Sequence, residues 1–99
     1  MTDFGSRTGF VGSVLDGDEG LLVLRGAQDG DVAPRVAEHL RTLLVAGARH
    51  VRVDARGASG LGADLLPVLG RIQTRLNLRR GVLTVSGLRL DAVARVAAA

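Results

Sequence analysis

Hydrophobic positions recur with two different periods along this chain, and the change of period marks its elements. Residues 8–15 (TGFVGSVL) alternate, which places Phe10, Gly12 and Val14 on one face of a strand. Residues 21–26 (LLVLRG) form a short apolar run that ends at a glycine, as a buried strand does. Asp16-Gly17 between the two runs is a hairpin signal, so the two strands are predicted to be antiparallel.

Helical spacing follows this hairpin. Pro34 falls where a first helical turn tolerates proline, and Gly47 is placed to end the helix. Residues 49–54 (RHVRVD) alternate again and predict a third strand, with Val51 and Val53 on one side. The apolar positions of the helix itself are Val36, Leu40, Leu43 and Leu44.

A loop rich in glycine, ARGASGLG at 55–62, separates the third strand from a second amphipathic helix. Pro67 is tolerated only near a helix start, so this helix is predicted to begin at residues 62–65 and to end near 79–81. Residues 81–87 (GVLTVSG) predict a fourth strand, and 88–99 a short third helix. The apolar positions of the second helix are Leu61, Leu65, Leu69, Ile72 and Leu76.

The resulting order, β-β-α-β-α-β-α, predicts an α/β fold. Strands that alternate with helices pair in parallel through right-handed crossovers, and the leading hairpin adds one antiparallel strand. We therefore expect a small mixed four-stranded sheet with an N-terminal hairpin and helices mainly on one face. Residues 1–99 form one domain in this interpretation, and the polar residues 1–7 are expected to be disordered.

The charge pattern does not favour a nucleic-acid partner. All 13 basic residues are arginine, but they are scattered among 10 acidic residues and the net charge is only +3. Two phenylalanines are the only aromatic residues, so there is no platform on which bases could stack. The sequence contains no apolar run of transmembrane length and no signal peptide, so we expect a cytoplasmic protein that does not insert into a membrane.

Catalytic and cofactor sites find little support in the residues. The glycine loop lacks the lysine of a phosphate-binding loop, and its spacing G-x-x-G-x-G differs from the dinucleotide motif. Ser59 lies in GASG rather than G-x-S-x-G, with only His39 and His50 available as bases, and both are expected at the surface. The chain has no cysteine, and two histidines are too few for a closed zinc site. We predict no catalytic residues, cofactor or metal.

Acidic residues stand at both predicted helix starts. Asp31 precedes the first helix and Asp64 opens the second, where a carboxylate caps free N–H groups and meets the positive end of the helix dipole. Helix capping is the expected role of both.

Residues 21–69 resemble a STAS domain, the fold of bacterial anti-sigma factor antagonists, and the resemblance runs without gaps from about residue 21 to 87. The family's turn after the second strand, G-E-L-D-like, corresponds to Gly26-Ala27-Gln28-Asp29, and Pro34 to a proline near the start of the following helix. The third strand of the family ends in an aspartate followed by a small loop, matched by 54–57. The D-S-S-G-L-like motif that opens the second helix corresponds to residues 62–66 (GADLL).

The resemblance implies a partner switch rather than an enzyme. In such proteins a serine of the motif is phosphorylated by an anti-sigma factor that is also a kinase, and the added charge separates the two. Here that position is Ala63, which has no hydroxyl and cannot be phosphorylated. Asp64 supplies one fixed negative charge beside it. The resemblance assigns partner binding to Asp29, Gly62, Ala63, Asp64 and Leu65.

Two interpretations of this resemblance stay open. The protein is an anti-sigma factor antagonist that cannot be switched at residue 63, with a serine-kinase-like anti-sigma factor as partner. Alternatively, it is a STAS scaffold or regulatory subunit of a larger complex, such as a stressosome-like assembly or a transporter, with other STAS proteins or copies of itself as partners. Leu65 is a contact residue if it is exposed, but its spacing with Leu61 and Leu69 is also that of a core residue.

Overall fold

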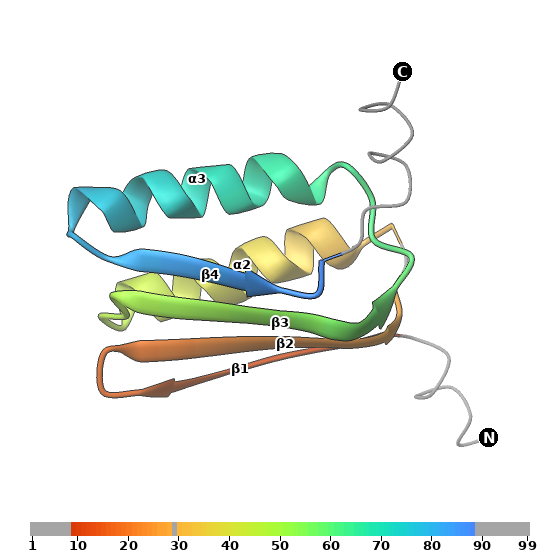
Figure 1. The fold of residues 1–99 in the computed structure, drawn as a ribbon, viewed down its shortest axis with the longest axis horizontal. Helices are drawn as coiled ribbons and strands as arrows, with labels where there is room; N and C mark the ends of the chain where they lie inside the picture. Colours follow the sequence, from red (N-terminus) through yellow and green to blue (C-terminus); the bar gives the residue numbers. More distant parts are fainter. Residues whose placement is uncertain (1–8, 29, 89–99) are drawn as a thin grey trace.

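The computed structural model describes residues 9–28 and 30–88, and within them one mixed sheet is backed by two helices (Figure 1). The expected third helix and the polar residues 1–7 lie outside the described residues. The elements in chain order are β1 Phe10–Asp16, β2 Glu19–Ala27, α2 Val32–Val45, β3 His50–Ser59, α3 Leu65–Leu78 and β4 Val82–Ser86.

The strands lie side by side in sequence order, β1-β2-β3-β4 (Figure 1). β1 and β2 form the antiparallel hairpin, in which Asp16 pairs with Glu19 and Gly17 takes the left-handed φ of 65° that its turn requires. β2 and β3 are parallel, and so are β3 and β4. The mixed α/β fold predicted from the hydrophobic pattern is confirmed for the described residues.

The core lies between one face of the sheet and the two helices. Every second residue of each strand points into the core. Among them are Leu22, Leu24, Val51 and Val53, each no more than 2% exposed. The apolar positions of both helices that the spacing singled out meet them there. These helix residues are Val36, Leu40, Leu43, Leu44, Leu65, Leu69, Ile72 and Leu76.

Both helices begin and end as their sequences indicate. Pro34 and Pro67 are each the third residue of their helix, where no intrahelical N–H bond is lost. Gly47 follows α2 with φ 107°, and Arg80 follows α3 with φ 59°. Neither helix in the described part of the chain is long and apolar enough to cross a membrane.

Two expectations about the elements need correction. β3 extends to Ser59, so most of the predicted loop at 55–62 is strand, because an irregularity between Val23 and Arg25 lets residues 57–59 continue the pairing with the end of β2. Asp31 and Asp64 do precede the helices, but neither side chain makes a capping hydrogen bond. Both residues have φ and ψ near the helical region rather than the extended geometry typical of a capping residue.

Candidate functional site

The loop from Gly60 to Asp64 leaves the end of β3 and leads into α3, beside the end of β2 (Figure 1). Gly60 has φ 75°, and a Cβ at this position would lie 2.7 Å from the carbonyl oxygen of Gln28. The backbone N–H of Gln28 donates to the carbonyl oxygen of Ser59 over 2.9 Å. The connections that follow β2 and β3 are therefore packed backbone against backbone, which only glycine allows at residue 60.

The side chain of Gln28 links the backbones of β1 and β2 at this end of the sheet. Its side-chain Nε2 donates to the carbonyl oxygens of Arg25, at 2.8 Å, and Phe10, at 3.3 Å, which ties β1 to β2. The residue is 8% exposed, and its Oε1 is buried without a hydrogen-bond partner among the described residues. Sequence reasoning treated Gln28 only as part of a turn. A lone glutamine beside an apolar strand was the one available signal of a buried amide.

The backbone at the start of α3 is already hydrogen-bonded. The N–H of Leu65 donates to the carbonyl oxygen of Gly62 at 3.2 Å, and the N–H of Leu66 to that of Ala63 at 3.0 Å. Pro67 has no N–H to offer. Of the four N–H groups that a helix start leaves unpaired by its own helix, these three are thus accounted for. These N–H groups are therefore not available to bind an anion.

The side chains at this helix start divide into exposed and buried ones. Ala63 and Asp64 are exposed and Gly62 is half-buried. Leu65 is only 1% exposed, so it is a core residue and its side chain is not accessible to a partner. The next residue, Leu66, is 43% exposed and takes the surface position. Asp29, the remaining residue that the resemblance assigns to partner binding, lies outside the described residues.

The candidate catalytic residues are not brought together. Ser59 and His50 stand at opposite ends of β3. His39 is half-buried, and its Nδ1 lies 2.7 Å from the Ser13 hydroxyl oxygen. His39 therefore lies at the surface, but on a face of α2 that contacts β1 rather than fully in solvent.

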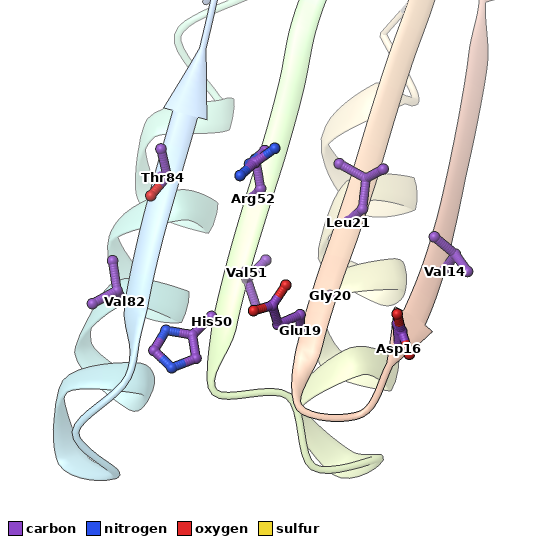
Figure 2. Close-up of a pocket in the computed structure, with 10 residues that line it drawn as sticks. All are labelled: Val14, Asp16, Glu19, Gly20, Leu21, His50, Val51, Arg52, Val82 and Thr84. Carbon is purple, nitrogen blue, oxygen red and sulfur yellow. The ribbon is translucent and has the colours of Figure 1, made fainter.

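The face of the sheet opposite α2 and α3, here named the bare face, is a second candidate surface, and it carries Val14, Leu21, Arg52 and Thr84. A shallow hollow of about 490 Å³ lies there at the hairpin end of the sheet. Figure 2 shows both helices behind the strands and Leu21, Arg52, Val14 and Thr84 in front of them. Three of the six large apolar side chains with the greatest exposure among the described residues belong to this face: Phe10, Val14 and Val82.

An ion pair lies farther along the same face. Arg56 Nε donates to Asp54 Oδ1 and Arg56 Nη2 donates to Asp54 Oδ2, each at a distance of 3.0 Å. The backbone N–H of Arg56 also donates to Asp54 Oδ1, at 3.1 Å. These hydrogen bonds from Arg56 lower the pKa of Asp54 from 3.8 to about 2. Asp54 is the aspartate that ends the third strand in the resemblance. Its carboxylate is therefore already paired with Arg56, two residues along the chain.

No protein-family model and no curated protein matches the sequence. Solved structures do match. The crystal structure of an anti-sigma factor antagonist from Mycobacterium paratuberculosis superposes with a TM-score of 0.65 at 15% identity, over 79% of this chain and 66% of that one. The chain has a STAS-like fold.

A second match is the STAS domain of an antisigma-factor antagonist from Rhodobacter sphaeroides, with a TM-score of 0.49 at 14% identity over 81% of this chain and 87% of that one. At such identities the likeness concerns the fold, and the Mycobacterium match spans just under two thirds of that structure. Within the STAS-like fold of this chain, the exposed loop with Ala63 and the bare face of the sheet are two separate surfaces.

Proposed function

We propose that this protein is a non-enzymatic interaction module that binds a protein partner through the start of α3, in the manner of an anti-sigma factor antagonist in partner switching. The observation that carries the proposal is the exposed surface of Ala63, Asp64 and Leu66, at a helix start where the N–H groups of Leu65 and Leu66 are already hydrogen-bonded. A rigid surface with an exposed leucine suits recognition by packing. The STAS-like fold, shared with an anti-sigma factor antagonist, supports it.

The partner we propose is a cytoplasmic anti-sigma factor of the serine-kinase type. Because Ala63 has no hydroxyl, the partner cannot release this protein by phosphorylating residue 63. Asp64 brings a single negative charge, against about −1.5 to −2 for a phosphate. The protein would therefore remain in one binding state with respect to this site.

Binding through the start of α3 is tested with paired leucine variants. Leu66→Asp places a charge at the proposed contact, whereas Leu78→Asp places one at the far end of the same helix, where Leu78 is 84% exposed. We expect Leu66→Asp to weaken binding of the kinase-like anti-sigma factor by at least about tenfold, as for the loss of a contact worth about 1.4 kcal/mol. Equal binding by both variants, measured by calorimetry, would refute the proposed surface.

The missing switch is tested by Ala63→Ser. This residue is exposed, so a serine hydroxyl would be accessible to a kinase. We expect the wild type to take up no phosphate at residue 63, and the variant to gain one phosphate and lose affinity for the partner. Intact-protein mass spectrometry after incubation with the kinase reads this out. A variant that stays unmodified beside a phosphorylated control antagonist would contradict recognition of this surface by the kinase.

A second candidate function is a scaffold or regulatory subunit in a larger assembly. The bare face of the sheet favours it, because a scaffold needs a docking surface besides the loop at Ala63. Co-purification separates the two candidates. Recovery of an anti-sigma factor supports the first, and recovery of other STAS proteins or of a transporter supports the second.

A further inference from the structure

The bare face, which α2 and α3 leave uncovered in the described part of the chain, is unusual for a sheet with parallel strand pairs. Two of the three strand pairs are parallel, and parallel sheets are normally covered on both faces. Here α2 and α3 both lie on the other side (Figure 2). Phe10, Val14 and Val82 on the bare face are 57%, 58% and 52% exposed. A face of this kind is expected to be covered in the working state of the protein.

The strand register arranges the bare face in four rows that run across the sheet. Each row holds side chains that are directly opposite on neighbouring strands, and successive rows are two residues apart, about 7 Å. From the hairpin end, the rows are Asp16, Glu19, His50 and Val82; Val14, Leu21, Arg52 and Thr84; Gly12, Val23, Asp54 and Ser86; and Phe10, Arg25 and Gly57.

This pattern is complementary to itself under one rotation. A two-fold axis that lies between two stacked sheets, perpendicular to the strands, exchanges the second row with the third. Leu21 then faces Val23 of the other copy, and Arg52 faces Asp54. Thr84 likewise faces Ser86. On the hairpin strands apolar side chains meet apolar ones. On β3, Arg52 meets the carboxylate of Asp54, which also binds Arg56 of its own chain.

The same rotation exchanges the first row with the fourth. Glu19 then faces Arg25 of the other copy, and the symmetry repeats this pair on the other side of the axis. Asp16 and Phe10 also exchange places, but they lie on the edge strand β1, where solvent reaches both. A two-fold axis parallel to the strands would instead set Leu21 against Arg52 and Val23 against Asp54, which is a poorer match.

We propose that two copies of this protein form a symmetric dimer through their bare faces, as two sheets packed face to face with antiparallel strands. Such a sandwich joins the two sheets through the side chains of their facing rows, about 10 Å apart. Four strands by four rows cover roughly 500 Å² per copy. Stable interfaces bury about 800 Å² per partner, so the dimer dissociates on dilution.

The dimer leaves the start of α3 outside the interface. Ala63, Asp64 and Leu66 belong to the helix layer and its loop, whereas the interface uses only sheet residues. The inference is therefore independent of the proposed binding of an anti-sigma factor. Either can fail without the other.

Sedimentation equilibrium of the full chain, from about 1 µM to about 1 mM, tests the dimer. The wild type should shift from monomer to dimer and no further, because a two-fold interface is closed. Leu21→Asp should remain monomeric, whereas Val45→Asp, on an 83% exposed residue of α2, should dimerise as the wild type does. A wild type that stays monomeric throughout, or a folded Leu21→Asp protein that still dimerises, would overturn the proposal.

Charge reversal tests the orientation and does not depend on Leu21. Glu19→Arg and Arg25→Glu should each weaken the dimer at least about tenfold, because each creates two like-charge contacts. The double variant should recover to within about threefold of the wild type. Glu19 and Arg25 are six positions apart along β2, about 20 Å, so pairing within one copy cannot produce the recovery. A double variant no tighter than the single ones would refute this packing.

Discussion

The two faces of the sheet are built from adjacent residues of the same strands, and their environments differ completely. In β2, Leu22 and Leu24 are 0% and 1% exposed under the helices, whereas Leu21 and Val23, on the bare face, are only half-buried. Leucine occurs on both faces, so residue type alone does not decide its role. A shift of one position along the strand decides whether a leucine holds the fold or is offered to a partner.

Strand order explains why the two helices of the described residues lie on the same face of the sheet. The chain moves in one direction across the sheet, from β2 to β3 to β4, and each step contains a helix. Two right-handed crossovers in the same direction place both helices on the same side. Among the described residues, the bare face is thus a consequence of the topology.

The largest expected effect separates the two faces directly. Leu22→Ala removes a fully buried side chain and leaves a cavity, which should lower the free energy of unfolding by about 2–5 kcal/mol. Leu21→Ala removes the same atoms from the half-buried neighbour and should cost less than about 1 kcal/mol. Urea denaturation of both variants at low micromolar concentration measures the difference.

Dilution matters in that experiment because the dimer stabilises the native state by mass action. At high protein concentration Leu21→Ala should lose additional stability relative to the wild type, whereas the Leu22→Ala difference should not change with concentration. Equal losses for the two variants at low concentration would show that the two faces are not distinct in energy.

Most of the fold follows from the sequence because the spacing of its hydrophobic residues clearly distinguishes strands from helices. Alternation places Val51 and Val53 on the covered face, and Pro67 fixes the start of α3. These signals are local, and the crossover rule turns them into a sheet topology.

The candidate site was less predictable because its features depend on contacts between distant segments. The pairing of residues 57–59 with the end of β2 lengthened β3, and no local pattern announces such a pairing. Leu65 and Leu66 are adjacent leucines, and only the packing of α3 on the sheet shows which is buried. The self-complementary rows of the bare face need the strand register, which a single sequence does not supply.

An intermediate effect is expected at the loop that joins the sheet to the helix layer, where the backbone rather than a side chain is limiting. Gly60→Ala should cost about 1–2 kcal/mol for a left-handed alanine, plus the cost of a Cβ only 2.7 Å from the carbonyl oxygen of Gln28. Gly70→Ala is the control, since a Cβ inside α3 there meets nothing within 4 Å and should stabilise by about 1 kcal/mol. Thermal denaturation reports both, and a stabilising Gly60→Ala would contradict the close backbone packing at this loop.

The smallest expected effect concerns the ion pair on the bare face, because exposed pairs contribute little to stability. Arg56 lowers the pKa of Asp54 from 3.8 to about 2, so the pair stabilises the fold above pH 4 and this contribution is lost as the pH falls from about 4 to about 2. The wild type should exceed Arg56→Met in melting temperature at neutral pH, and the gap should close over that acid range. Arg41→Met, on α2 and outside any salt bridge of the described residues, should show no such closing gap. NMR titration of the Asp54 carboxyl checks the cause: a pKa that stays near 2 in Arg56→Met would show that Arg56 does not set it.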